Sequence, residues 1–124
     1  MIDDDDKIHE ECGVVGVFHK ENCLNILVTA LHALQHRGQE SAGVAMSNGQ
    51  LIKAYRKTGL VSHLASKVRY FKEFDGHLGV GHTRYSTTGS SNLLNSQPIL
   101  IDYKNGQLAV AHNGNLTNAQ ALRT

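Results

Sequence analysis

The sequence predicts an α+β fold, in which mostly antiparallel strands form sheets and helices lie outside them. A run of apolar and β-branched residues at 13–18 is typical of a buried strand. From residue 24 to residue 34 the apolar side chains follow helical spacing. Two Asn-Gly pairs further along the chain each separate two short apolar runs, and this pattern indicates β-hairpins.

The first helix is predicted between Asn22 and Gly38. Asn22 can cap its start, because asparagine side chains accept hydrogen bonds from free helix amides, and Gly38 follows its expected end. One face of this helix is apolar and consists of Leu24, Leu27, Val28, Leu31 and Leu34.

A second, short helix is predicted at 61–68, and a strand that runs into a loop is predicted at 77–85. A last helix begins near Thr117 or Asn118, and the chain ends before this helix is complete. We therefore expect a truncated gene product or a fragment. The two hairpins join 42–47 to 51–55 through Asn48-Gly49, and 99–103 to 108–111 through Asn105-Gly106.

The composition of the 124 residues excludes several classes of protein. Hydrophobic residues make up 40% and charged residues 19%, as in globular proteins, and no run of 18 apolar residues predicts a membrane span. The formal net charge of +1 gives no electrostatic reason to expect a nucleic-acid partner. Two cysteines, Cys12 and Cys23, make a poor disulfide framework, which favours a reducing, cytoplasmic location.

Residues 1–11 are predicted to be a leader, and residues 12–124 a portion of one domain. The leader contains four consecutive aspartates followed by Lys7, a pattern typical of a solvated tail. The same block matches the recognition sequence of a processing protease used in protein expression, so an engineered origin is the alternative. Neither interpretation gives the block a catalytic role.

Four glycine-flanked polar clusters stand at the ends of predicted strands or helices, where side chains from different elements can converge on one site. The first of them raises the question of what a cysteine at the head of a buried strand does. The clusters are ECG at 11–13, HRGQ at 36–39, GHTRYSTTG at 81–89 and HNGN at 112–115.

Cys12 is the candidate nucleophile. A thiol becomes a strong nucleophile when a base takes its proton, and that base is either one of the eight histidines or the α-amino group of the cysteine itself. An α-amine titrates at about pH 7.7–8.0 and a thiol at about pH 8.5, so the free base is plentiful around neutrality. The amine route requires cleavage between Glu11 and Cys12. The alternative is a buried core cysteine without a catalytic role.

Three further positions offer groups that recognise an amide substrate. Arg84 carries a planar charged fork suited to a carboxylate such as that of glutamine, or else forms a surface ion pair. Arg37 either positions the nucleophile or bonds the last carbonyls of a helix. Asn113 and Gly114 either form a simple turn or supply a side-chain amide and a backbone N–H as an oxyanion hole.

No metal site is predicted. His32 and His36 stand four residues apart on the first helix, but no acidic residue or cysteine stands at the spacing that would complete a zinc site. We predict surface or capping roles for both histidines and a packing role for Cys23. No glycine-rich phosphate loop is present in the sequence.

Together the clusters resemble the glutaminase domain of the amidophosphoribosyltransferase family, which acts in the first step of purine biosynthesis. The resemblance covers about residues 8–120. Any one of the motifs is weak, but all five in this order and spacing are highly specific. They are ECGVVGV at 11–17, LQHRGQESAG at 34–43, GHTRYSTTG at 81–89, QP at 97–98 and AHNGNL at 111–116.

The resemblance implies the four-layer αββα sandwich of the amino-terminal nucleophile hydrolases, incomplete in this chain, and a role for six residues. It implies that the leader is removed, as in family members that carry one. The implied roles are nucleophile for Cys12, carboxylate binding for Arg84 with Thr87 nearby, oxyanion hole for Asn113 and Gly114, and shaping of the site for Arg37.

The implied reaction is hydrolysis of glutamine to glutamate and ammonia. In the full-length enzyme this ammonia converts phosphoribosyl pyrophosphate to 5-phosphoribosylamine. The domain for that step is absent, as is an acidic residue that holds the substrate's α-amino group, so we expect the fragment to be inactive alone. The resemblance further implies Mg²⁺ and, in some members, an iron–sulfur cluster in the full-length enzyme, no cofactor within this chain, and a homo-oligomer when complete.

Two alternatives stay open. One is the glutaminase domain of the glucosamine-6-phosphate-forming amidotransferases, in which a tyrosine stands on each side of Arg-Gly, where this chain has His36 and Gln39. The other is a non-catalytic fragment that binds a ligand or partner without turnover.

Overall fold

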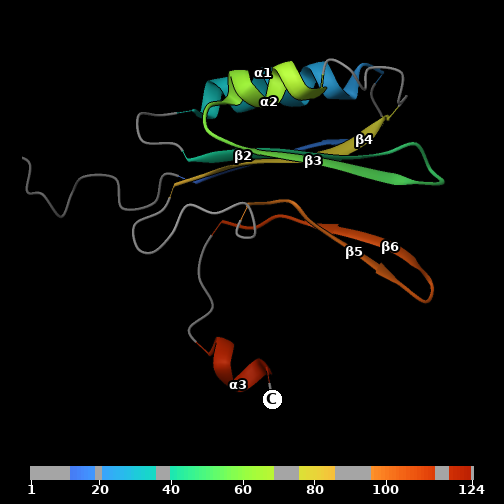
Figure 1. Cartoon of the computed structure of the whole chain (residues 1–124). Coiled ribbons are helices and arrows are strands. Elements are labelled where there is room, and N and C mark those ends of the chain that lie inside the picture. Colours follow the sequence, from blue (N-terminus) through green and yellow to red (C-terminus); the bar gives the residue numbers. More distant parts are fainter. Residues whose placement is uncertain are drawn as a thin grey trace, which may run out of the picture.

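The chain folds into two antiparallel sheets with helices outside them, which confirms the predicted α+β class (Figure 1). No helix in the part that the structure describes is long and apolar enough to cross a membrane. The structure is a computed structural model, and it describes residues 12–18, 21–35, 40–68, 76–85, 96–113 and 118–123.

Sheet A has four strands in the spatial order β1-β4-β2-β3, and each strand is antiparallel to its neighbours. β1 comes first in the chain but pairs with β4, so its partner lies about 70 residues away in the sequence. The four strands are β1 (Gly13–Phe18), β2 (Ser41–Ser47), β3 (Ile52–Thr58) and β4 (Leu78–Arg84).

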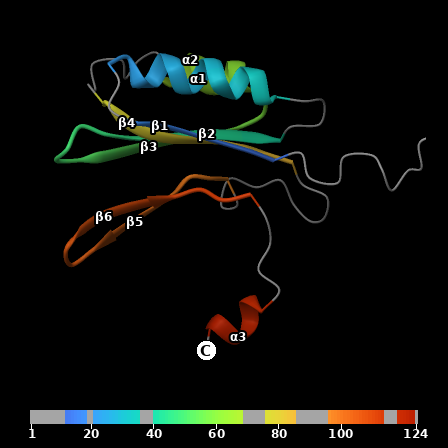
Figure 2. The same ribbon diagram turned by 180° about the vertical axis from the view of Figure 1, so that it is seen from behind.

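Two helices, α1 (Cys23–Leu34) and α2 (Val61–Val68), cover one face of sheet A, as Figures 1 and 2 show from opposite sides. The side chains between these helices and the sheet form the main core, and removing their apolar surface from water is the main force that stabilises this layer. The core consists of Cys23, Leu27, Leu31, Ala42, Val44, Met46, Tyr55, Val61, Leu64 and Val68.

Glycines in β4 allow α1 to lie close to the sheet. A Cβ added at Gly79 would lie 2.8 Å from Leu27 Cδ1 and 3.0 Å from Cys23 Sγ. A Cβ added at Gly81 would lie 3.2 Å from Leu31 Cδ2. Side chains at both positions would collide with Leu27 and crowd Cys23 and Leu31, so α1 or these side chains would have to shift.

The ends of α1 differ in part from the prediction. Asn22 precedes the helix with a left-handed backbone, φ 56° and ψ 35°, and its side chain makes no capping hydrogen bond, so its predicted capping role is wrong. The helix ends where Gln35 becomes extended, and the Gln35 Oε1 accepts a hydrogen bond from the amide of Val61 at 2.7 Å. This side chain therefore satisfies a free amide at the start of α2. Gly38 lies outside the described residues.

Both predicted hairpins are present, but their turns differ from the predicted pairs. In the first, the Asn48 side chain accepts hydrogen bonds at 2.9 Å from the amides two and three residues further on, so the loop spans 48–51. In the second, the turn residues are Lys104 and Asn105, and Gly106 with φ 142° is already the first residue of the returning strand.

The second hairpin, β5 (Ile99–Tyr103) with β6 (Gly106–Val110), is sheet B. It lies across the face of sheet A that is opposite α1 and α2, and the short helix α3 (Ala119–Arg123) lies beyond it (Figures 1 and 2). The order of elements through the molecule is therefore helices, sheet A, sheet B and α3.

Two hydrogen bonds from β3 hold sheet B and the segment before it against sheet A. The Ile52 amide donates to Gln107 Oε1 of β6 at 2.7 Å. The Arg56 Nη1 donates to the carbonyl oxygen of Ser96 at 2.9 Å, just before the hairpin begins. The two bonds start from residues four positions apart in β3, so they set both the distance and the direction of the hairpin.

The outer face of sheet B is apolar and open to solvent in the described part of the chain. Its side chains share one face, because cross-strand partners and alternate residues point the same way. They are each 40–53% exposed and comprise Ile99, Ile101, Tyr103, Leu108 and Val110.

We expect Gly43→Ala to lower the free energy of unfolding by about 1–3 kcal/mol, the usual effect of forcing extra volume into a packed site. Gly43 in β2 faces the backbone carbonyl of Gln97, and an added Cβ would overlap that oxygen. Urea unfolding measures the change. Gly16→Ala, on the same face of sheet A, is the control, because its Cβ would meet nothing within 4 Å. Equal destabilisation by the two changes would contradict the contact.

Candidate active site

The predicted nucleophile and the predicted carboxylate-binding arginine lie side by side at one end of sheet A. β1 and β4 are in register with Gly13 opposite Thr83, and the Gly13 amide donates to Thr83 Oγ1 at 3.2 Å. This bond holds the start of β1 in place. Cys12, the residue before Gly13, is thereby placed next to Arg84, the last residue of β4.

Both side chains point to the face of sheet A on which sheet B lies. A Cβ at Gly13 would lie 2.9 Å from Leu34 of α1 and 3.0 Å from Thr83 Oγ1, so Gly13 and Thr83 face the helices. Side chains alternate along a strand. Arg84, which follows Thr83 in β4, and Cys12, which directly precedes Gly13, therefore face away from the helices and towards the side of sheet A on which sheet B lies.

The sulfur of Cys12 is held by the backbone of Tyr85. The Tyr85 amide donates to Sγ at 3.3 Å, and the thiol donates to the Tyr85 carbonyl oxygen at 3.6 Å. Cys12 is only half-buried. It is therefore not the buried core cysteine that the sequence left open as the alternative.

Cys23 has the opposite environment. It is 1% exposed and belongs to the core between α1 and sheet A. Burial raises the pKa of its thiol above the ordinary value, because the charged thiolate would lose its hydration. The predicted packing role of Cys23 is confirmed.

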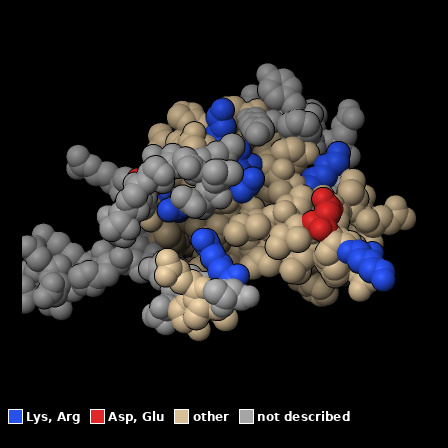
Figure 3. Space-filling model, turned by 60° about the horizontal axis from the view of Figure 1, so that its bottom comes forward, with Lys and Arg blue, Asp and Glu red and all other residues tan. Residues whose placement is uncertain are grey.

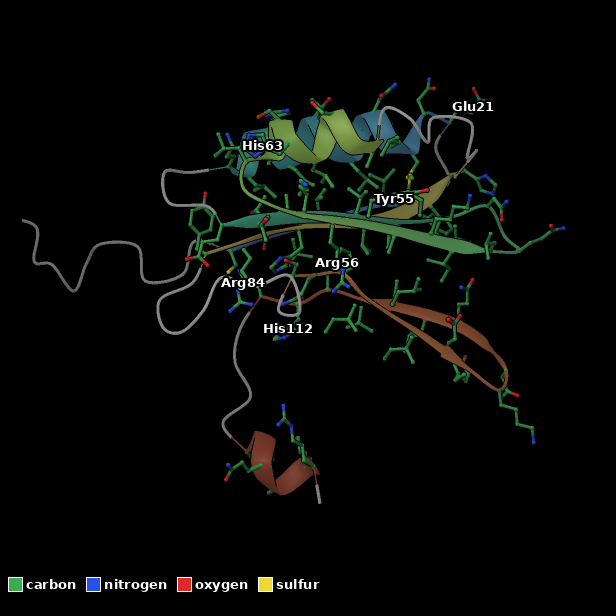
Figure 4. All side chains as sticks on the ribbon, in the orientation of Figure 1. Glu21, Tyr55, Arg56, His63, Arg84 and His112 are labelled. Atoms are coloured by element: carbon green, nitrogen blue, oxygen red, sulfur yellow. The ribbon has the colours of Figure 1, made fainter. Side chains whose placement is uncertain are left out.

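Asn113 follows β6 and comes to the same end of the sheets as Arg84. The residue before it, His112, is exposed, but its main chain bonds on both sides: its amide donates to Gln97 Oε1 at 2.7 Å, and its carbonyl oxygen lies 3.1 Å from His82 Nε2. Since a carbonyl oxygen only accepts, His82 Nε2 carries the proton in this bond. Figure 4 shows Arg84 and His112 close together at this end of the two sheets.

Among the described residues, the charged side chains on the face of the molecule that carries sheet B are mostly basic. Figure 3 shows this face with more Lys and Arg than Asp and Glu among the described residues.

Three predicted site residues, Arg37, Thr87 and Gly114, lie outside the described residues, as do the leader and His36. His32 is exposed on α1, as predicted for a surface residue. Within the described ranges, no group of three or more His, Cys, Asp and Glu side chains is placed to hold a metal ion.

Sequence reasoning assigned no role to two side chains that the structure places at the site, His82 and Gln97. Both stand inside motifs that the sequence singled out, GHTRYSTTG and QP. A histidine inside a predicted strand is a signal that could have pointed to His82, which is 1% exposed. The function of Gln97 depends on a contact 15 residues away in the sequence, so no local pattern reveals it.

The family model described as "Glutamine amidotransferases class-II" matches residues 57–124, more than half of the chain. The chain belongs to the class-II glutamine amidotransferases.

Within that class, the chain resembles amidophosphoribosyltransferases. It is 46% identical to "Amidophosphoribosyltransferase 3, chloroplastic" of Arabidopsis thaliana over 99% of this chain and 23% of the relative, and 47% identical to the amidophosphoribosyltransferase of Synechocystis over 95% and 24%. The solved structure of the glutamine phosphoribosylpyrophosphate amidotransferase from B. subtilis, complexed with ADP and GMP, superposes with a TM-score of 0.78 at 39% identity, over 89% of this chain and 23% of that one. The chain thus spans about a quarter of the length of these relatives.

Alkylation of the native chain by iodoacetamide near neutral pH is expected to modify Cys12 and spare Cys23. The raised pKa of Cys23 keeps it in the unreactive thiol form, and its burial excludes the reagent. Peptide mass mapping measures both sites, and the urea-unfolded chain, in which both should react, is the control. Comparable labelling of both cysteines before unfolding would show that the assigned environments are wrong.

Proposed function

We propose that the chain carries the glutamine-hydrolysing site of an amidophosphoribosyltransferase, with Cys12 as the nucleophile. The observation that carries this proposal is the position of the Cys12 sulfur, held by the Tyr85 backbone next to Arg84. The family match begins at residue 57 and does not include Cys12, so the geometry of β1 and β4 is an independent argument.

The thiol is activated by the α-amino group of Cys12 after residues 1–11 have been removed. While the Glu11–Cys12 peptide bond is intact, this nitrogen is an amide and is not basic. Once free, the amine takes the proton of the thiol, and the thiolate attacks the side-chain amide carbon of glutamine. The tetrahedral intermediate expels ammonia, which takes its proton from the Cys12 ammonium group. Water then hydrolyses the thioester to glutamate and restores the thiol.

Arg84 binds the α-carboxylate of glutamine with its planar fork, assisted by Thr87, and Arg37 shapes the site around the cysteine. Asn113 and Gly114 donate hydrogen bonds to the oxygen that becomes negative in the tetrahedral intermediate. Losing one donor of such a hole costs about 3–4 kcal/mol of transition-state stabilisation. The support for this arrangement is that Cys12, Arg84 and the segment leading into Asn113 converge at one end of the sheets.

In the whole protein, the released ammonia is proposed to react with phosphoribosyl pyrophosphate and give 5-phosphoribosylamine. That step belongs to a domain outside these 124 residues, as do any Mg²⁺ and iron–sulfur cluster of the longer enzyme. A homo-oligomeric state, a cytoplasmic location and the inactivity of the isolated chain stay predictions. The names of the relatives reported above favour this function over the formation of glucosamine 6-phosphate.

The full domain is proposed to be the four-layer αββα sandwich. The order of helices, sheet A, sheet B and α3 in this chain is consistent with that architecture (Figure 1). A non-catalytic role would need a reason for a half-exposed thiol to stand beside an arginine at a strand end, and no described feature supplies one.

A chloromethyl ketone analogue of glutamine is expected to alkylate Cys12 of the chain from which residues 1–11 have been removed. The thiolate sulfur bonds to the methylene carbon and chloride leaves. This single alkylation requires neither the release of ammonia nor the hydrolysis of a thioester, which turnover requires. Mass mapping locates the label. The chain with its leader attached is the control and should react at least tenfold more slowly, because it lacks the free amine. Equal rates would rule out the amine as the base.

Arg84→Lys is expected to raise the half-saturating concentration of the same analogue by about tenfold or more, since one charge-assisted hydrogen bond is worth about 1.5–3 kcal/mol. Lysine keeps the charge but loses the fork. Arg123→Lys, in the exposed helix α3, is the matched control and should change nothing. An unchanged half-saturating concentration for Arg84→Lys would show that Arg84 does not bind the carboxylate of the analogue.

In a longer protein that includes the synthase domain, Cys12→Ala is expected to abolish glutamine-dependent synthesis and to spare synthesis from added ammonia. The reason is that only the amide hydrolysis uses the thiol. Parallel assays with glutamine and with an ammonium salt measure the two activities. Loss of both would mean that Cys12 has a structural role.

A further inference from the structure

The main chain of His112 is held from both sides, and this double attachment stands directly before Asn113. Its amide donates to Gln97 Oε1 at 2.7 Å, and its carbonyl oxygen accepts from His82 Nε2 at 3.1 Å. We call Gln97 and His82 the clamp. We propose that the clamp positions the Asn113 turn against the nucleophile, so that both side chains are positioning residues for the hydrolysis. This inference rests on the proposed function.

The His82 half of the clamp belongs to the same strand as the substrate-binding arginine. His82 and Arg84 are two residues apart in β4, roughly 7 Å along the strand, and both face sheet B. His82 is 1% exposed, so its ring is fixed by the surrounding sheet. A shift of the arginine and a shift of the oxyanion turn are therefore coupled through one rigid strand.

The Gln97 half of the clamp is anchored to sheet A on its other side. The Gln97 backbone lies directly against Gly43 of β2, and the preceding residue, Ser96, accepts a hydrogen bond from Arg56 of β3 at 2.9 Å. Because Gln97 is held against β2 and next to a residue bonded to β3, its hydrogen bond fixes the His112 backbone relative to sheet A. Each half of the clamp relates the turn to sheet A, where the nucleophile strand is held.

The geometry indicates that the clamp positions Asn113 and does not only stabilise the fold. An oxyanion hole works only when its donors lie 2.7–3.1 Å from the developing charge, so a displacement of about 1 Å lowers the rate without preventing substrate binding. His112 and Asn113 are both exposed, so burial of their side chains contributes little to holding this segment in place. Two hydrogen bonds to its backbone supply that restraint.

The chain provides a matched control for Gln97. Gln107 makes the same kind of contact, with its Oε1 accepting a backbone amide between the two sheets at 2.7 Å, and it is also half-buried. Its partner is Ile52, at the end of β3 that is remote from Asn113. Removing either acceptor weakens the contact between the sheets, but only one of them borders the site.

The test measures inactivation of the leader-free chain by the chloromethyl ketone analogue. Gln97→Met is expected to lower the maximal inactivation rate constant by about tenfold, because a displaced Asn113 no longer donates to the ketone oxygen of the analogue, whose polarised carbonyl activates the neighbouring methylene carbon. The half-saturating concentration should stay within about twofold, because Arg84 still binds the carboxylate. Gln107→Met should stay within about twofold in both. Gln97→Glu, which keeps an acceptor oxygen, should restore most of the rate. Equal losses in Gln97→Met and Gln107→Met would overturn the proposal, since they would indicate a general effect of sheet packing.

Amide hydrogen exchange of the whole chain provides a second readout that does not depend on the chemistry. In Gln97→Met the His112 amide should exchange about tenfold faster than in the wild type, and in Gln107→Met it should not change. If Gln97→Met fails to fold, Gln97→Asn shortens the side chain and withdraws the acceptor with less disturbance. Faster exchange with an unchanged inactivation rate would show that the clamp does not position the turn.

The two readouts separate the clamp from the proposed function. A wild-type chain that never reacts with the analogue contradicts the glutaminase assignment and, with it, the positioning role, whatever the exchange data show. A wild-type chain that reacts, but whose rate is insensitive to Gln97→Met, leaves the glutaminase assignment standing and overturns the positioning role alone.

Discussion

The antiparallel pairing of β1 with β4 is the constraint on which the rest of the structure depends. It joins residues about 70 positions apart and places Cys12 beside Arg84. A slip of one residue in β1 would turn the cysteine towards α1 and leave the arginine on the opposite face of the sheet, because the side-chain period of a strand is two. The Gly13 amide bonded to Thr83 Oγ1, together with the Tyr85 backbone bonded to the cysteine sulfur, opposes that slip.

The two faces of sheet A have different functions. The face under α1 and α2 carries the apolar core, with glycines where the helix comes closest. The face under sheet B carries His82, Arg84 and the close contact between Gly43 and the Gln97 backbone. The stability of the fold and the chemistry of the site are thus assigned to opposite sides of one sheet, which allows polar groups to converge without being buried in the main core.

Local patterns in the sequence predicted the elements well and their long-range partners poorly. The strand at 13–18 and the helix at 61–68 follow from apolar periodicity and are found at those residues. The predicted capping role of Asn22 is wrong, because its backbone is left-handed and its side chain makes no capping hydrogen bond. The first hairpin loop is longer than the Asn-Gly pair suggested, since the Asn48 side chain organises four residues.

The residues of the candidate site could be proposed from residue type and motif, but their relative placement could not. Cys12, Arg84 and Asn113 were recognised from their chemistry and from a family resemblance, whereas the placement of β1 beside β4 is a choice among possible partners that periodicity cannot make. His82 and Gln97 gained a role only when the sheets were stacked, because each bonds a backbone group distant in sequence.

The strand order also implies an order of events in folding. β2 and β3 are adjacent along the chain, and a short loop joins them, so they can pair early. β1 must wait until β4 is available, and closing so long a loop is slower because more chain entropy is lost at once. During synthesis from the amino end, the cysteine therefore emerges long before its partner strand and stays without the neighbours that define its chemistry until the most distant pairing has formed.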